Sequence, residues 1–296
     1  MRKTGLPLKL PKDEVNDWWR SVNIDIDGEL FFFTGLLYQL TPYIESSVKI
    51  LEKIEKSKTK HLLPLLSVVP ASFIRIALSP KNKELYSEIV RRIYRLLKIS
   101  GVSLKYDPSL DFYSGIILYD LGEEGLFAEH ANFVVEKLEE SGVEKVVTID
   151  PHTAYALKKL YPKFAGRTFK VAIYLELLEN LKGSLNEKVA LHDPCYYARY
   201  LDACESIRKL LKNSGVRVIP VRNSGEMTSC CGGTIESLSA RLSKEIAKIR
   251  VEELGGGKIV TACPICLSNL RRAGGNVVDL CSLIFQEDSL KSRNRI

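Results

Sequence analysis

The stretch KVALHDPC at residues 188–195 decides the fold of this chain, because an apolar strand pattern leads there directly into a cysteine. The same order recurs at RVIPV, residues 217–221, before the pair Cys230-Cys231, and at KIV, residues 258–260, before Cys263. A helical pattern follows each cysteine group. In a parallel α/β sheet such strand-to-helix turns gather at the carboxyl ends of the strands. The three cysteine groups are therefore predicted to meet at one edge of a sheet.

Five of the seven cysteines belong to these groups. They are Cys195, Cys230, Cys231, Cys263 and Cys266. Several thiolates in one place repel each other, and a metal ion or an iron–sulfur cluster supplies the opposing positive charge. Five ligands are one too many for a closed tetrahedral zinc site, which favours a cluster. A thiol–disulfide centre and plain burial of the cysteines are the alternatives.

The order Cys, then Cys-Cys-Gly, then Cys-Pro-x-Cys resembles the cysteine-rich domain called CCG. That domain occurs in the cysteine-rich subunit of heterodisulfide reductases and in the iron–sulfur subunits of glycolate, lactate and glycerol-3-phosphate oxidoreductases. The opening His192-Asp193-Pro194-Cys195 is also familiar from this family. The resemblance implies that the five cysteines hold a non-cubane [4Fe-4S] cluster. Gly232 and Gly233 would let the backbone approach such a cluster closely.

The resemblance also implies a function and partners. We expect the iron–sulfur subunit of an oxidoreductase complex, which transfers electrons or reduces a disulfide or a quinone-type acceptor. The family's ferredoxin-like domain is missing from the sequence, although residues 5–19 resemble the linker that would follow it. We therefore expect a ferredoxin-like iron–sulfur subunit on a separate chain, with a flavoprotein beside it. The Trp18-Trp19 arm is expected to pack onto the body and to contribute to the docking surface. The insertion between Tyr43 and Ser87, with its apolar stretch at residues 61–78, is the other candidate surface, or else a helix packed on the protein's own core.

An internal repeat relates the two halves of the chain. VTIDPHT at residues 147–153 aligns with VTACPIC at residues 260–266, and Tyr113-Ser114-Gly115 aligns with Cys230-Cys231-Gly232. The first half thus resembles a second CCG domain in which every ligand is replaced. The replacing residues are Leu36, Tyr113, Ser114, Asp150 and Thr153.

The fold class predicted from these patterns is α/β, with two pseudo-repeated halves, each a small parallel sheet flanked by helices. We expect an N-terminal arm at residues 1–28 and a degenerate CCG-like domain at residues 29–180. Spacing between the repeats places an insertion at about residues 43–87 of that domain. The cluster-binding CCG domain is expected at residues 187–290.

The composition and charge of the chain exclude several classes of function. The formal net charge is +7, and basic and acidic residues are interspersed, so we expect no nucleic-acid groove. The clustered, odd-numbered cysteines and the lack of an apolar signal core indicate a cytoplasmic protein. Pro64, Pro70 and Arg75 interrupt the apolar stretch, which excludes a membrane span there but leaves contact with a membrane surface open. The glycines at 255–257 precede a strand pattern, so they indicate no nucleotide site.

Simpler roles are expected for the remaining candidate residues. Asp150 is predicted to be a helix cap, and His152 a surface or packed histidine. Cys204 and Cys281 are expected to be ordinary buried cysteines outside the site. His192 is either a neighbour of the cluster or a structural hydrogen-bonding residue. A zinc-stapled scaffold protein and a thiol–disulfide oxidoreductase with a dithiol at Cys263 and Cys266 are the two alternative functions.

Overall fold

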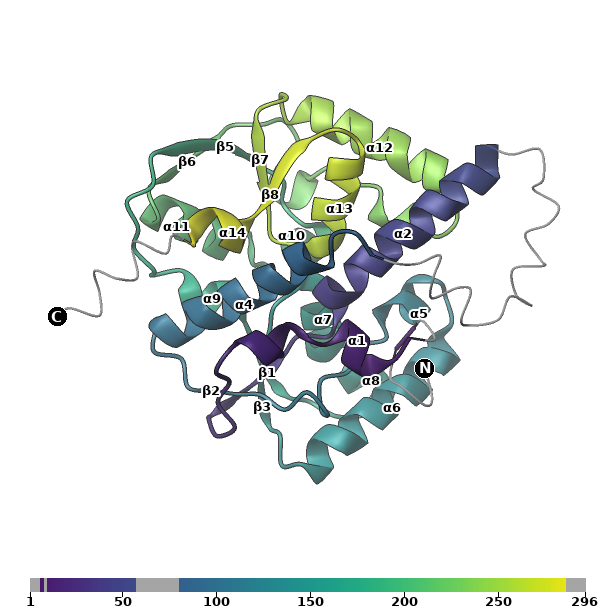
Figure 1. The fold of residues 1–296 in the computed structure, drawn as a ribbon, viewed down its shortest axis with the longest axis vertical. Coiled ribbons are helices and arrows are strands. Elements are labelled where there is room, and N and C mark those ends of the chain that lie inside the picture. The colour runs from purple at the N-terminus through teal and green to yellow at the C-terminus, as the bar shows by residue number, and fades with distance from the viewer. Residues whose placement is uncertain (1–5, 8–9, 57–79, 286–296) are drawn as a thin grey trace.

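The computed structural model describes residues 6–7, 10–56 and 80–285, and its first half contains a parallel four-stranded sheet (Figure 1). The strand order is β2-β1-β3-β4. The strands are β1 (Leu30–Phe33), β2 (Leu104–Lys105), β3 (Lys145–Thr148) and β4 (Lys170–Ile173). Phe31, Phe32 and Phe33 are all buried. Continuous apolar strands of this kind form when helices cover both faces of a parallel sheet.

The second half contains a second parallel four-stranded sheet, with the order β6-β5-β7-β8. Its strands are β5 (Glu187–Leu191), β6 (Val216–Ile219), β7 (Lys258–Thr261) and β8 (Asn276–Asp279). Both sheets therefore follow the same path, in which the third strand crosses back to the far side of the first. The predicted fold class, α/β with two pseudo-repeated halves, is confirmed. The exact limits of the proposed domains stay predictions.

Helices connect the strands in both halves. Those of the first half are α2 (Leu37–Lys56), α4 (Lys83–Ile99), α5 (Ile116–Asp120), α6 (Glu124–Glu140), α7 (Pro151–Tyr155), α8 (Tyr161–Ala165) and α9 (Tyr174–Leu178). Those of the second half are α10 (Cys195–Arg199), α11 (Cys204–Asn213), α12 (Ala240–Glu253), α13 (Pro264–Arg272) and α14 (Leu280–Ile284). One π-helical turn at Ala156–Leu160 joins α7 to α8.

The N-terminal arm packs onto the first sheet. It contains α1 (Lys12–Val15) and a 3-10 turn at Trp18–Ser21. The ring of Trp18 is fully buried, with its centroid 5.4 Å from that of Phe32 and 4.9 Å from that of Tyr106. Aromatic packing of this kind anchors the arm to the core. The expected packing of the arm onto the body is confirmed for Trp18, whose side chain is not at the surface. That the arm contributes to a docking surface stays a prediction.

Helix α2 joins the two halves, since it lies beside α12 and α13 of the second half (Figure 1). The Glu55 carboxylate accepts hydrogen bonds from the backbone N–H groups of Ala240 and Arg241, at 2.8 and 2.9 Å. Near the other end of α2, the Tyr38 hydroxyl donates to the Asp279 carboxylate at 2.8 Å. These contacts fasten the first half to the second at both ends of one helix.

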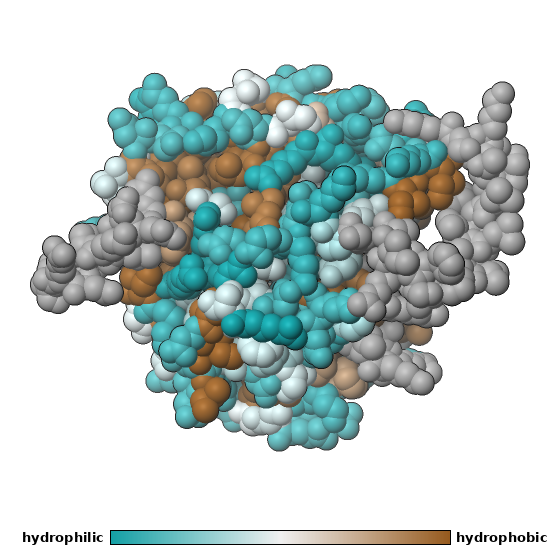
Figure 2. Space-filling model, viewed as in Figure 1, coloured by the Kyte–Doolittle hydropathy of each residue, from teal (hydrophilic) through white to brown (hydrophobic). Residues whose placement is uncertain are grey.

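The predicted insertion at about residues 43–87 begins within α2. Its apolar stretch at residues 61–78 lies outside the described residues. In the part of the chain that the structure covers, no helix has the length and apolar character needed to cross a bilayer. Figure 2 shows hydrophilic side chains over most of one face, with smaller hydrophobic patches between them.

Candidate functional site

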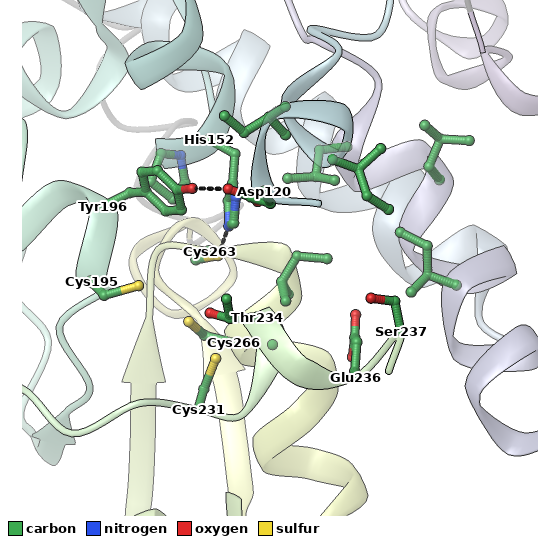
Figure 3. Close-up of a pocket in the computed structure, with 18 of the residues that line it drawn as sticks. Asp120, His152, Cys195, Tyr196, Cys231, Thr234, Glu236, Ser237, Cys263 and Cys266 are labelled. Carbon is green, nitrogen blue, oxygen red and sulfur yellow. Dashed lines mark hydrogen bonds between the residues drawn. The ribbon is translucent and has the colours of Figure 1, made fainter. Parts of the chain in front are cut away.

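The fold brings the three cysteine groups together around one cavity of about 220 Å³. Cys195 opens α10 just after β5, and Cys263 is the N-cap residue of α13 just after β7. β5 and β7 are neighbours at the point where the strand order reverses, which is where open α/β sheets bind ligands. The sulfur atoms of Cys195, Cys231, Cys263 and Cys266 point toward a shared space (Figure 3).

All five predicted ligands line this cavity, but they differ in burial. Cys231, Cys263 and Cys266 are buried, and Cys195 and Cys230 are half-buried. Of the other two cysteines, Cys204 is the first residue of α11 and Cys281 lies in α14. Neither of them lines the cavity.

The glycines after the cysteine pair leave no room for a side chain. Gly232 has a φ of +85°, and a Cβ there would lie 2.3 Å from the carbonyl oxygen of Ser243. A Cβ on Gly233 would lie 2.6 Å from the side chain of Ile265. The Gly232 N–H donates to the Cys230 sulfur at 3.2 Å. The glycines therefore set the path of the turn and supply one of its N–H···S bonds.

The surroundings of Cys195 and Cys263 shift the pKa values of their thiols in opposite directions. Burial raises the pKa of Cys195 to about 12, so this thiol keeps its proton in the free protein. Burial acts in the same direction on Cys263, but hydrogen bonds from Cys266 and His152 outweigh it and lower the pKa to about 5. The thiolate form of Cys263 is therefore favoured at the start of α13, where its negative charge would attract a nearby cation.

His192 is held by a buried arginine and directed at the cysteines. Arg250, fully buried and paired with Glu253 at 2.8 Å, donates from Nε to His192 Nδ1 at 3.1 Å. The ring proton therefore belongs on Nε2. Nε2 is buried and finds no hydrogen-bond partner among the described residues. A ring nitrogen of His192 and the sulfurs of Cys231 and Cys266 lie within 4.8 Å of one another. His192 is thus both structurally fixed and adjacent to the site.

Hydrogen bonds to Asp193 hold the His-Asp-Pro-Cys turn in place. Its buried carboxylate accepts two hydrogen bonds from Arg208, each 2.8 Å, and one from the Gly225 N–H at 2.7 Å. The Thr228 hydroxyl donates to its backbone carbonyl at 3.0 Å. Asp193 therefore ties the Cys195 turn to the loop that leads to the cysteine pair. Sequence reasoning singled out the motif but gave this residue no role.

A histidine of the first half reaches the cysteines of the second half. As predicted, Asp150 caps α7, since its carboxylate accepts from the N–H groups of His152 and Thr153, each at 2.9 Å. The His152 ring then reaches across to the second half, where Nε2 lies 3.7 Å from the Cys263 sulfur. Its other face packs on Tyr196, with the ring centroids 4.5 Å apart. The cap was predictable, but the reach to Cys263 was missed, because no local pattern marks it.

The corresponding corner of the first half keeps the backbone shape without the ligands. Gly115, aligned with Gly232 by the repeat, has nearly the same conformation, with a φ of +81°. The five residues that the repeat aligns with the cysteine positions are all buried: Leu36, Tyr113, Ser114, Asp150 and Thr153. Among the described residues, the one group of His, Cys, Asp or Glu placed to bind a metal is in the second half. That the first half binds no metal stays a prediction.

Comparison with known proteins agrees with this geometry. The family model CCG, described as a cysteine-rich domain, matches residues 189–271. A probable iron-sulfur-binding oxidoreductase, FadF, of Bacillus subtilis (strain 168) is 32% identical over 60% of this chain and 27% of its own length. The EtfAB:quinone oxidoreductase of Syntrophomonas wolfei is 29% identical over 62% of this chain and 28% of its own length.

A third relative is a probable membrane-anchored ferredoxin of Chromohalobacter salexigens, 25% identical over 70% of this chain and 34% of its own length. The chain therefore spans about a third or less of each of these relatives. The family match covers all three cysteine turns and the strands that position them. Residues 189–271 therefore resemble the CCG cysteine-rich domain.

Proposed function

We propose that this chain is the iron–sulfur subunit of an oxidoreductase complex, similar to the cysteine-rich subunit of heterodisulfide reductases. In this proposal Cys195, Cys230, Cys231, Cys263 and Cys266 hold a non-cubane [4Fe-4S] cluster. The observation that supports it best is that five cysteines from three separate strand-to-helix turns line one cavity. The relatives named as an iron-sulfur-binding oxidoreductase and a quinone oxidoreductase point to the same class.

The residues around the cavity suit such a group. The thiolate favoured at Cys263 and the N–H groups at the start of α13 suit a cationic iron centre bound through sulfur. The proton on His192 Nε2 lacks a partner among the described residues and could be donated to sulfur, as the Gly232 N–H already is to Cys230. When bound, the cluster would accept and release single electrons, with a potential set by burial and by hydrogen bonds to its sulfurs. The protein's part is to exclude water, place the thiolates and supply these donors.

The complex in this proposal contains a ferredoxin-like iron–sulfur subunit and a flavoprotein, and it lies in the cytoplasm. Residues 187–290 would be the cluster-binding domain and residues 29–180 its degenerate repeat. The matching strand order of the two sheets supports this division. All seven cysteines are free, as a reducing compartment would keep them.

Anaerobic purification followed by iron, sulfide and zinc analysis tests the proposal. We expect about four irons per chain and broad visible absorption that bleaches on reduction. Cys231→Ser should lose the iron, whereas Cys281→Ser, the matched control in a buried helix away from the cavity, should keep it. A colourless protein, or iron that survives Cys231→Ser, would refute the ligand assignment.

A zinc-stapled scaffold is the second candidate. It is favoured by the three donors His192, Cys231 and Cys266, whose ligand atoms lie within 4.8 Å of one another. Zinc binds such nitrogen and sulfur sets readily. This alternative requires one zinc per chain, no visible absorption, and loss of the zinc in His192→Ala. The cluster proposal instead expects iron to remain in His192→Ala.

A thiol–disulfide oxidoreductase is the third candidate function. The low pKa of Cys263, about 5, is typical of the first cysteine in a redox-active Cys-x-x-Cys motif at a helix start. This alternative requires a dithiol at Cys263 and Cys266 that titrates reversibly, with neither iron nor zinc bound.

A further inference from the structure

Helix α12 has an inner face that supports the cysteine site and an outer face that is open to solvent. On the inner face, the carbonyl oxygen of Ser243 closes the space beside Gly232, and Arg250 holds His192. Ala247 on the same face is fully buried. The helix lies at the outer edge of the second half (Figure 1). Its outer face is therefore accessible to another molecule.

The outer face of α12 carries a row of apolar side chains. We call Leu242, Ile246 and Ile249 the outer stripe, since they are spaced four and three positions apart and lie on one side of the helix. Leu242 is 44% exposed and Ile249 is 58% exposed, and Ile246 between them is half-buried. Leu238, just before the helix, is 73% exposed. Single exposed apolar residues are ordinary, but a row of them on one helix marks a contact surface.

Four charged residues of alternating sign run beside the outer stripe. We call Arg241, Glu245, Lys248 and Glu252 the charged row, and all four are exposed. They are spaced four, three and four positions apart, so they also share one side of α12. Glu245 and Lys248 form an ion pair within the helix at 2.9 Å, but about half of each side chain is exposed. Such an exposed pair contributes little to stability, so both groups are available to a partner.

The charged row is complementary to itself when a second copy of the helix runs in the opposite direction. Reversal keeps the spacing of four, three and four positions but inverts the order of the signs. Arg241 then faces Glu252 of the second copy, and Glu245 faces Lys248 of the second copy. A parallel copy in the same register would place like charges together. The row therefore favours one partner and one orientation, as the flanking charges of paired helices do.

We propose that two copies of this chain associate through α12, with the two helices antiparallel and related by a two-fold axis. The outer stripes then cover each other, and each member of the charged row meets an opposite charge. A helix of 14 residues is about 21 Å long, so this pair alone covers less than the roughly 800 Å² per partner of a standard interface. The dimer should therefore dissociate on dilution. The inference does not depend on the proposed function, because neither set of residues is among the described residues that line the cysteine cavity.

Sedimentation equilibrium of the full chain at several concentrations tests this inference, and we expect a monomer–dimer equilibrium in the wild type. Ile249→Lys should weaken the dimer at least tenfold, because it places a charge within the apolar contact. Leu126→Lys is the matched control, since Leu126 is 47% exposed on a different helix, α6, and its replacement should leave the dissociation constant unchanged. If Ile249→Lys does not fold, Leu242→Lys serves in its place.

Three results of the concentration series would overturn the inference. They are a wild type that is monomeric at every concentration, a dimer that Ile249→Lys leaves unchanged, and equal losses in Ile249→Lys and Leu126→Lys. An outer stripe that is covered by a different subunit gives the first of these results.

Charge reversals test the antiparallel orientation. In the proposed dimer, Lys248→Glu brings two negative charges together and Glu245→Lys brings two positive charges together, so each variant alone should dimerise at least tenfold more weakly. An equimolar mixture of the two variants should dimerise again, because one copy is then negative and the other positive at both positions. Undiminished dimers of the single variants, or a mixture that stays monomeric, would refute the pairing.

Discussion

The hydrogen bond between Tyr38 and Asp279 should make the coupling of the two halves dependent on pH. Both side chains are fully buried, and the hydroxyl of Tyr38 donates to the carboxylate at 2.8 Å. Burial raises the pKa of Asp279 to about 6, although the bonds from Tyr38 and from the Cys281 backbone oppose this. The carboxyl group is therefore neutral at pH 5 and ionised at pH 8.

The direction of the pH dependence of stability follows from the raised pKa of Asp279. The folded state holds the proton more tightly than the unfolded state, so the stability contributed by Asp279 is complete below the unfolded pKa of 3.8 and is lost as pH rises through about 6. Tyr38→Phe removes a donor to the ionised form and raises this pKa further. A bond to a charged group contributes about 2 kcal/mol and one to a neutral group about 1 kcal/mol. The substitution should thus cost about 2 kcal/mol at pH 8 and about 1 kcal/mol at pH 5.

Urea unfolding of the wild type and Tyr38→Phe at both pH values measures this difference. Tyr161→Phe is the matched control, because Tyr161 is equally buried but its hydroxyl donates to the neutral Ser114 carbonyl at 3.2 Å. Its cost should be about 1 kcal/mol at either pH. If Tyr38→Phe costs the same free energy of unfolding at pH 5 and pH 8, the reasoning about Asp279 is wrong.

Three further predictions concern the cysteine site. Gly232→Ala should destabilise the protein by clearly more than the roughly 1 kcal/mol expected for Gly255→Ala, whose φ is similarly positive but whose Cβ would meet open space; urea unfolding compares them. His152→Phe should lower the midpoint potential of the bound centre, because a donor near the Cys263 sulfur is lost, and an unchanged potential in a redox titration would contradict this. A variant in which all five predicted ligand cysteines are changed to Ser should contain neither iron nor zinc by elemental analysis, and stoichiometric metal in it would contradict the prediction that the first half binds no metal.

The sequence by itself determined the fold class and the position of the cysteines along it. Apolar strands followed by helical patterns are local signals, because the direction of side chains along a strand or helix depends on neighbouring residues. Parallel strands then place the turns after β5, β6 and β7 at one edge. The repeat was also readable, since the corner at residues 147–153 keeps the strand, cap and proline of its counterpart although no ligand remains.

The tertiary structure alone decided how the two halves share one site. His152 and Cys263 are separated by 111 positions, and Arg250 lies 58 positions from His192, so no periodic pattern could pair them. The surroundings of the apolar stripe on α2 could not be predicted, because a helix pattern shows which residues are apolar but not what they face. Only the docking of α2 against α12 and α13 turned part of that stripe toward the cysteines. Contacts between distant segments depend on the packing of the whole chain, and local sequence patterns do not encode that packing.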